Sequence, residues 1–156
     1  MSILAVYESG DLHCPRRVLT HVEDIQRALA ELGLSLITEA TSPSGAAVSR
    51  CHDAHGLPAY QQVQDQLTEE DIFTSGDVIR QVLAGQLRLC VGGHGWALVI
   101  ALRAGDGIRL PAGLEQCILP AAGIDCRWRD SAAEESALTY HPLDAPALSG
   151  LLPLDI

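Results

Sequence analysis

The pattern of apolar and polar positions near the N-terminus predicts one strand and then one helix. Residues 2–7, SILAVY, form a short apolar run typical of a strand. Thr20 and Glu23 have the spacing of a capping box, in which two side chains satisfy free backbone N–H groups at the start of a helix. Apolar residues then recur at helical spacing, and Gly33 is suited to end the helix. These apolar positions are Val22, Ile25, Leu29 and Leu32.

The next segment predicts a short strand, a loop and a second helix. Residues 34–37 are mostly apolar and indicate a strand, whereas residues 41–57 are rich in Ser, Gly, Ala and His and are typical of a loop. A second helix is expected after Pro58, because apolar residues again recur at helical spacing. These residues are Tyr60, Val63 and Leu67, and residues 68–71 can start one further helical turn.

From about residue 77 the pattern changes to short apolar stretches that Gly and Pro interrupt every 8–12 residues. This spacing is typical of an antiparallel sandwich or barrel. GGHG at 92–95 and AGDG at 104–107 have hairpin-turn chemistry, since glycine accepts the positive φ that such turns need. The expected strands lie within residues 87–91, 96–102, 108–110, 117–119 and 126–128.

We therefore expect a mainly β protein in which two α-helices precede a β-barrel. The 156 residues are the size of one domain, so a single domain is expected over residues 1–156. Within it, residues 1–76 form the strand and helical lead-in and residues 77–140 form the barrel core. The proline-rich residues 141–156 form an extended, partly draped tail.

Composition narrows the possible partners and the compartment. With 47% hydrophobic and 19% charged residues, the chain is typical of a globular protein. Its formal charge is −10 and it has no Lys/Arg run, which argues against nucleic acids and anionic membranes as partners. No apolar run is long enough to span a membrane, and the N-terminal residues do not resemble a signal peptide. The 5 cysteines form no C-x-x-C pair, which favours a reducing cytoplasm over a disulfide framework.

Residues 105–116, GDGIRLPAGLEQ, resemble the second cupin motif, G-x5-P-x-G-x2-H, at every position but the last. Gln116 stands where cupins place a metal-binding histidine. Residues 59–79 are similar to the helical lead-in of the acireductone dioxygenases, and LRLCVGGHG at 87–95 resembles that family's V-R-F-F-V-E-G-x-G strand and turn. The resemblance covers residues 3–140 and implies a cupin fold, which is a jelly-roll, or double-stranded β-helix, barrel.

The resemblance also implies which positions would carry a metal. Acireductone dioxygenases oxidise an enediol with Fe or Ni, held by an H-x-H-x3-E motif and a further histidine. Counting back from Leu87, the first three matching positions are Arg80, Val82 and Gln86, and the fourth is Gln116. An alignment anchored on residues 77–79 leaves this chain shorter than the family before the metal motif, so only Gln86 and Gln116 have matching flanks. None of the four residues is a good Fe or Ni ligand, and H-x-H occurs nowhere in the chain.

The expected function is therefore a metal-independent cupin enzyme without a cofactor. A cupin barrel encloses a pocket, and strand alternation places Gln86, Arg88 and Cys90 on one face. Arg88 matches an arginine that the family uses to contact its substrate. Arg88, with Arg80 if it points inward, favours a small anionic metabolite, because guanidinium binds carboxylates and phosphates through a bidentate fork. Such a site can stabilise an enolate and support an isomerase, cyclase or lyase reaction in a specialised biosynthetic pathway.

Two alternatives remain. The first is a metal-dependent cupin oxygenase with relocated ligands for Fe, Ni or Zn, for which the cluster Cys51, His52 and His55 is the strongest hint. His94 lies at a predicted hairpin tip and could join that set. The second is a non-catalytic cupin that binds a small molecule or dimerises. Cupins commonly pair as homodimers, and the apolar residues 148–156 could dock on a partner.

Overall fold

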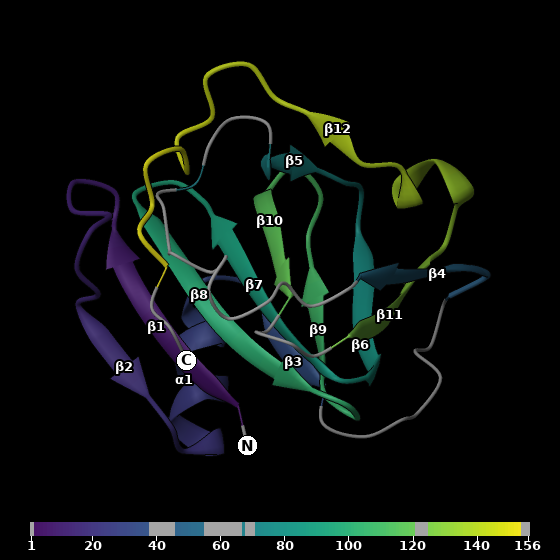
Figure 1. The fold of residues 1–156 in the computed structure, drawn as a ribbon, viewed down its shortest axis with the longest axis horizontal. Coiled ribbons are helices and arrows are strands. Elements are labelled where there is room, and N and C mark those ends of the chain that lie inside the picture. Colours follow the sequence, from purple (N-terminus) through teal and green to yellow (C-terminus); the bar gives the residue numbers. More distant parts are fainter. Residues whose placement is uncertain (1, 38–45, 55–66, 68–70, 121–124, 154–156) are drawn as a thin grey trace.

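The computed structural model contains two antiparallel β-sheets that face each other (Figure 1). It describes residues 2–37, 46–54, 67, 71–120 and 125–153. The seven-stranded sheet has the order β12-β5-β10-β7-β8-β1-β2, and the five-stranded sheet has the order β3-β9-β6-β11-β4. The chain crosses between the sheets repeatedly, so that consecutive strands such as β6 and β7 lie in different sheets. This agrees with the expected mainly β barrel.

The strands have the following bounds. The seven-stranded sheet consists of β1 (Ile3–Glu8), β2 (Arg17–Leu19), β5 (Phe73–Thr74), β7 (Gln86–Gly92), β8 (Trp96–Arg103), β10 (Glu115–Pro120) and β12 (His141–Pro142). The five-stranded sheet consists of β3 (Ser35–Ile37), β4 (Val48–Ala54), β6 (Val78–Ala84), β9 (Gly107–Leu110) and β11 (Cys126–Ala132). Residues 1–76 and residues 77–140 thus contribute strands to the same two sheets.

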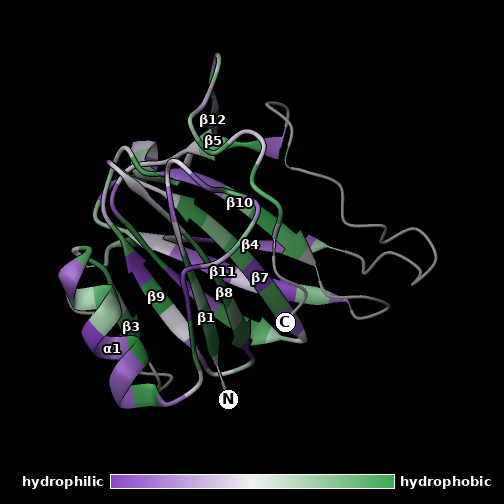
Figure 2. Cartoon of the chain, turned by 90° about the vertical axis from the view of Figure 1, so that its left-hand side faces the viewer, coloured by the Kyte–Doolittle hydropathy of each residue, from purple (hydrophilic) through white to green (hydrophobic). Residues whose placement is uncertain are grey.

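One α-helix, α1 (Val22–Glu31), lies within the described residues, beside β3. Its hydrophobic and hydrophilic residues are both visible in Figure 2. Ile25 and Leu29 are fully buried as predicted, but Val22 is 41% exposed because it lies in the first turn, away from the core. The predicted capping box is not formed: the N-cap is His21, without a side-chain cap hydrogen bond. Gly33 ends the helix with a φ of 77°, as expected.

Five strands were not expected from the sequence: β4 and β6, and the short strands β2, β5 and β12 of two or three residues each. Residues 48–54 were predicted as loop but form β4, because they pair with β11 over seven residue pairs, from Val48 opposite Ala132 to Ala54 opposite Cys126. Tertiary pairing therefore outweighs the polar composition of this segment. β6 was absent from the predicted strands, because Arg80 and Gln81 interrupt its apolar pattern. The second predicted helix, at residues 58–67, lies outside the described residues except for Leu67.

The seven-stranded sheet buries both of its faces. Leu87, Leu89 and Val91 of β7 point into the space between the sheets, here called the interior, and pack with residues of β6, β9, β11 and α1. The alternate residues of β7 point to the other side, here called the outer face. There Cys90 packs with Leu148 and Leu151 of the C-terminal tail, which is drawn in yellow across this sheet in Figure 1. The tail therefore completes a second apolar core.

A short 3-10 helix, η3 (Glu135–Leu138), leads from β11 into the tail. In the part of the chain that the structure describes, we find no helix that is long and apolar enough to cross a membrane.

Candidate functional site

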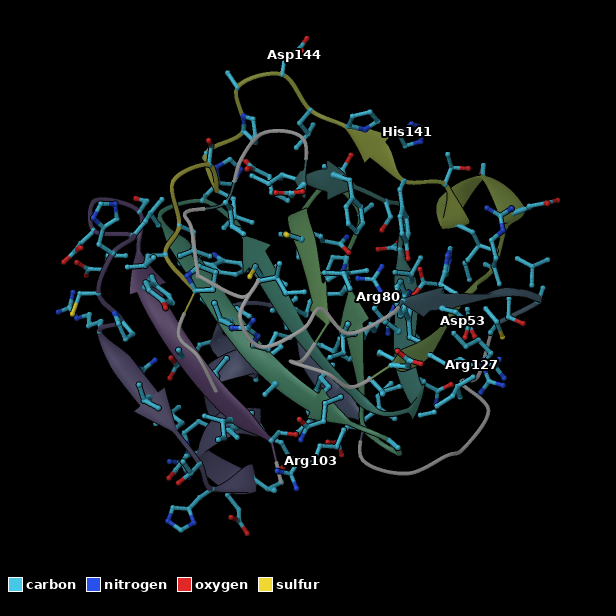
Figure 3. All side chains as sticks on the ribbon, viewed as in Figure 1. Asp53, Arg80, Arg103, Arg127, His141 and Asp144 are labelled. Carbon is cyan, nitrogen blue, oxygen red and sulfur yellow. The ribbon has the colours of Figure 1, made fainter. Side chains whose placement is uncertain are left out.

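The interior contains a fully buried arginine. Val78, Arg80 and Val82 alternate along β6 and face the interior, and Arg80 has an exposed fraction of 0%. Figure 3 shows Arg80 between the two sheets, away from the exposed pair of Asp53 and Arg127. Burying an unpaired charge is very unfavourable, so Arg80 requires compensating groups around it.

Asp130 supplies the opposite charge. It lies directly opposite Arg80, because β11 pairs with β6, and it too is fully buried. Arg80 Nε donates to Asp130 Oδ1 at 2.8 Å, and Nη2 donates to Oδ2 at 3.2 Å. Burial alone would lower the pKa of Arg80, but the charge and hydrogen bonds of Asp130 outweigh it and raise this pKa. The guanidinium is therefore permanently charged and held as a bidentate ion pair.

Gln116 completes the coordination of Arg80 from the opposite sheet. Arg80 Nη1 donates to Gln116 Oε1 at 2.7 Å, and Gln116 Nε2 donates to Ser75 Oγ at 3.0 Å. Gln116 is fully buried on β10, next to β5. The residue that stands at the cupin histidine position thus binds a protein cation through its amide oxygen.

Tyr140 closes the network on the side of the sheet edges. Its hydroxyl donates to Asp130 Oδ2 and accepts from Arg80 Nη2 at 3.3 Å and from Trp128 Nε1 at 3.2 Å. Burial is the main reason that the pKa of Tyr140 rises to about 12, so the phenol stays protonated at neutral pH. With Tyr140 in place, each nitrogen of the Arg80 guanidinium has a partner.

Four stacked rings connect the edges of the two sheets. His52 of β4 stacks between Trp128 and Tyr140, with ring-centroid distances of 5.3 Å and 5.2 Å, and Phe73 of β5 stacks on Tyr140 at 4.2 Å. Arg80 lies over the rings of Phe73 and Tyr140, which adds cation–π attraction. The edge strand that was predicted as a loop therefore supplies a side chain to the polar interior.

His52 is a titratable group of this network that is partly exposed. Its side chain is 25% exposed, and its Nε2 lies 3.9 Å from Asp130 Oδ2, too far for a hydrogen bond. This Nε2 atom is enclosed and has no hydrogen-bond partner. Burial lowers the pKa of His52, and Arg80 and Arg50 lower it further, whereas Asp130 and Asp53 raise it. His52 is therefore neutral at neutral pH.

The structure separates the residues that the sequence placed in one pocket. Gln116 and Arg80 meet in the interior, but Arg88 and Cys90 lie on the outer face of the seven-stranded sheet, where Cys117 and Leu119 are their neighbours on β10. Gln86 is the first residue of the same strand. It is partly buried, and its side chain points to the same face as Arg88 and Cys90. The expected convergence of Gln86, Arg88 and Gln116 is thus wrong, because Leu87, Leu89 and Val91 take the interior positions of β7.

The alternative metal cluster does not converge either. Cys51 and His52 are neighbours on β4, so their side chains point to opposite faces, and Cys51 is exposed. His55 lies outside the described residues, and His94 is exposed in the turn between β7 and β8. Among the described residues, no group of three or more His, Cys, Asp or Glu side chains could hold a metal ion.

The positions that match the family's ligands also do not fit a metal. A divalent ion would have to replace the Arg80 guanidinium, which already neutralises Asp130. Val82 is part of the apolar core. Gln86 lies on β7, where the side chains that alternate with the core leucines point to the outer face. Only Gln116 offers a neutral oxygen in the interior, and Arg80 uses it. A hard or borderline cation needs anionic or imidazole ligands, which these four positions lack.

Sequence reasoning missed Asp130 and Tyr140, although a signal for Asp130 was present. Cys126, Trp128, Asp130 and Ala132 alternate along β11, so a carboxylate falls on an otherwise apolar face. A charge in such a position requires a buried partner of opposite sign. No comparable pattern pointed to Tyr140, which lies in the irregular segment after η3.

Known proteins share this architecture. Two facing antiparallel sheets of this kind are typical of double-sheet jelly rolls, the architecture that cupins also have. The structure superposes on acireductone dioxygenase from Bacillus anthracis with a cadmium ion in its active centre, with a TM-score of 0.64, 10% identity and coverage of 90% of this chain and 97% of that chain. In sequence, 80 residues are 39% identical to acireductone dioxygenase of Stutzerimonas stutzeri (strain A1501). The resemblance to acireductone dioxygenases seen in the sequence is therefore confirmed, by a distant sequence relative and by the fold.

The sequence match has a limited extent. It includes 51% of this chain and 42% of the Stutzerimonas protein, so the chain spans less than half of that relative's length. No protein-family model matches the chain.

Proposed function

We propose that this cupin is a metal-independent enzyme of the isomerase, cyclase or lyase type, which moves protons on a small anionic metabolite with His52 as its acid–base group. The observation that carries the proposal is the environment of His52: a neutral imidazole, partly exposed, with Nε2 facing the buried carboxylate of Asp130. Imidazole beside carboxylate is the usual arrangement for general acid–base catalysis, because the carboxylate stabilises the imidazolium that forms.

The proton transfer can be assigned to specific ring atoms. When Nε2 carries the proton, it faces Asp130 Oδ2, which leaves Nδ1 as the basic nitrogen of the ring. Nδ1 would take a proton from a carbon next to a carbonyl or carboxylate and return it to another atom of the product. The Nε2–Oδ2 distance of 3.9 Å is longer than a hydrogen bond, and catalytic hydrogen bonds of this kind often shorten only when substrate binds.

Arg50 is the best candidate to hold the anionic group. It lies two residues before His52 on β4, so both side chains leave the same face of the strand. Its guanidinium acts on the pKa of His52 and approaches Glu135 only at 3.6 Å, with both side chains exposed. Such an exposed ion pair is weak, so a substrate carboxylate or phosphate can replace Glu135 at little cost. Arg50 takes the role that the sequence assigned to Arg88.

The Arg80 network supports metal independence. Arg80 supplies a fixed positive charge that holds Asp130 and Tyr140 in the interior without a metal ion. Because Asp130 and Gln116 occupy most of its donors, we assign Arg80 a positioning role for Asp130 and Tyr140 rather than direct contact with substrate.

The test is proton exchange between substrate and solvent. The full chain is incubated in D2O with a panel of small keto acids, hydroxy acids and their phosphate esters, and deuterium incorporation is followed by NMR. We expect incorporation that persists with a chelator present. His52→Gln should abolish exchange while binding, measured by saturation-transfer NMR, is retained, and Arg50→Gln should weaken binding.

Ser49→Ala is the matched control, because Ser49 is exposed on the opposite face of β4. It should leave exchange unchanged. Exchange that survives His52→Gln would overturn the assignment of the base, and exchange that requires added Fe or Ni would overturn metal independence.

A non-catalytic binding cupin is the second candidate, and one observation favours it. The interior around Arg80 is filled by its own hydrogen-bonding partners. Under this alternative, panel members bind near Arg50 but no member exchanges protons.

A further inference from the structure

Two buried cysteines lie side by side on the outer face of the seven-stranded sheet. Cys90 of β7 is directly opposite Cys117 of β10, and their exposed fractions are 0% and 1%. Residues directly opposite each other in an antiparallel pair point to the same face. The two side chains therefore leave the same face of the sheet from directly opposed positions of β7 and β10.

The backbone geometry of this pair suits a covalent bond between the sulfur atoms. Directly opposed residues of antiparallel strands have Cα atoms about 4.5–5.5 Å apart. Disulfides bridge Cα atoms about 4.4–6.8 Å apart, so the bond requires only rotation of the two side chains. Cys126 is also buried but lies in the other sheet, and Cys14 and Cys51 are exposed. Cys90 and Cys117 are therefore a matched pair among the 5 cysteines.

We propose that Cys90 and Cys117 form a redox modification site, at which a peroxide converts the two thiols into a cross-strand disulfide. One thiolate attacks a peroxide oxygen, which breaks the O–O bond, gives a sulfenic acid and releases water once the leaving oxygen is protonated. The second sulfur then attacks the sulfenic sulfur and forms the S–S bond, and the hydroxyl leaves as a second water with the remaining thiol proton. Two thiols are oxidised and one peroxide is reduced.

The C-terminal tail controls access to this pair. Leu148 and Leu151 pack on Cys90 and Cys117 in the same apolar cluster, and backbone hydrogen bonds between Leu67 and the tail hold it in place. The hydrogen bond with Cys117 and burial raise the pKa of Cys90, although Arg88 opposes this. Oxidation through Cys90 is therefore slow in the folded chain at neutral pH, and it becomes faster when the tail detaches or the pH rises.

Peptide mapping of the folded full chain tests the proposal. Exposed Cys14 and Cys51 are first blocked with iodoacetamide, and the folded protein is then treated with hydrogen peroxide. It is afterwards unfolded in the presence of a second alkylating agent, which labels any thiol that is still reduced. Trypsin leaves Cys117 and Cys126 on one peptide, so cleavage after Glu115 and Asp125 is used instead, which separates them. We expect a peptide containing Cys90 linked to residues 116–125, with a mass lower by two hydrogen atoms than the sum of the reduced peptides.

Variants and conditions define the outcome. Cys126→Ser should keep the link, and Cys117→Ser should lose it and leave Cys90 available to the second alkylating agent. The proposal is overturned if wild-type Cys90 and Cys117 both remain reduced while the chain is folded, or if the link forms only in urea that unfolds it. A link from Cys90 to Cys126 would equally contradict it. Because the mapping uses wild-type protein, the result does not depend on the variants folding.

Discussion

At the scale of single residues, the interior depends on one ion pair. Arg80 and Asp130 are both fully buried, whereas Asp53 and Arg127 form an ion pair with the same Nε–Oδ1 distance of 2.8 Å at the surface. Distance alone therefore does not set the contribution of a pair to stability. Removing one partner of a buried pair leaves an uncompensated charge in a medium of low polarity, and the exposed pair has water to replace a lost partner.

We predict that Arg80→Met lowers the free energy of unfolding by about 3–5 kcal/mol. Asp130→Leu should cost a similar amount, and the double variant should cost clearly less than the sum, because neither charge is left alone. Arg127→Met is the matched control and should cost less than about 1 kcal/mol. Urea denaturation measures all four. Additive losses in the double variant would show that the two side chains do not interact energetically.

A second prediction at this scale concerns His52 and pH. Burial lowers its pKa in the folded chain below the ordinary value of 6.5, so the unfolded chain binds more protons in that window. Stability should therefore rise with pH between the lowered pKa and about 6.5 and be complete above it. Asp130, Asp53, Arg80 and Arg50 are the charged groups that act on the pKa of His52. Denaturation of the wild type and of His52→Gln at a series of pH values from acid to neutral measures this pH dependence. The free energy of unfolding of the variant should rise less with pH than that of the wild type, and an identical rise in both would contradict the lowered pKa of His52.

At the scale of elements, the sequence predicted those strands and turns whose signal is local. One glycine in each of the 92–95 and 104–107 turns has a positive φ, 79° for Gly95 and 96° for Gly105. β7, β8 and β9 follow from apolar runs between those turns. β4 and β6 were missed, because their own sequences lack a clear apolar strand pattern. Both form strands through backbone pairing with β11, which lies between them.

The candidate site was only partly predictable for the same reason. The cupin motif identified Gln116, and the alignment identified Arg80, both of which lie in the interior. Strand alternation correctly grouped Arg88 with Cys90, but it cannot say which face of a sheet is inside when both faces are apolar. Here the tail buries the outer face, so Leu119 and Cys117 are as apolar there as Leu89 is in the interior. His52 and Asp130 became neighbours only through the pairing of β4 with β11.

At the scale of the whole molecule, the C-terminal tail is an integral layer. Leu148 and Leu151 have exposed fractions of 1% and 0%, and Tyr7 Oη donates to the carbonyl oxygen of Leu152 at 3.1 Å. Glu115 accepts the backbone N–H of Leu148 at 2.8 Å, which fixes the tail to the start of β10. The apolar residues Leu148 and Leu151 therefore dock on the chain's own sheet.

The contribution of the tail can be measured with one pair of variants. Leu151→Ala removes fully buried methyl groups from the outer-face cluster, so we expect a loss of about 2–5 kcal/mol in the free energy of unfolding. Leu83→Ala removes the same atoms from a side chain that is 40% exposed and should cost far less. Because Leu151 packs in the cluster of Cys90 and Cys117, its truncation should also expose these thiols to alkylation in the folded chain. Equal stability of the two variants, with both thiols still protected, would mean that the tail only lies on the sheet without stabilising it.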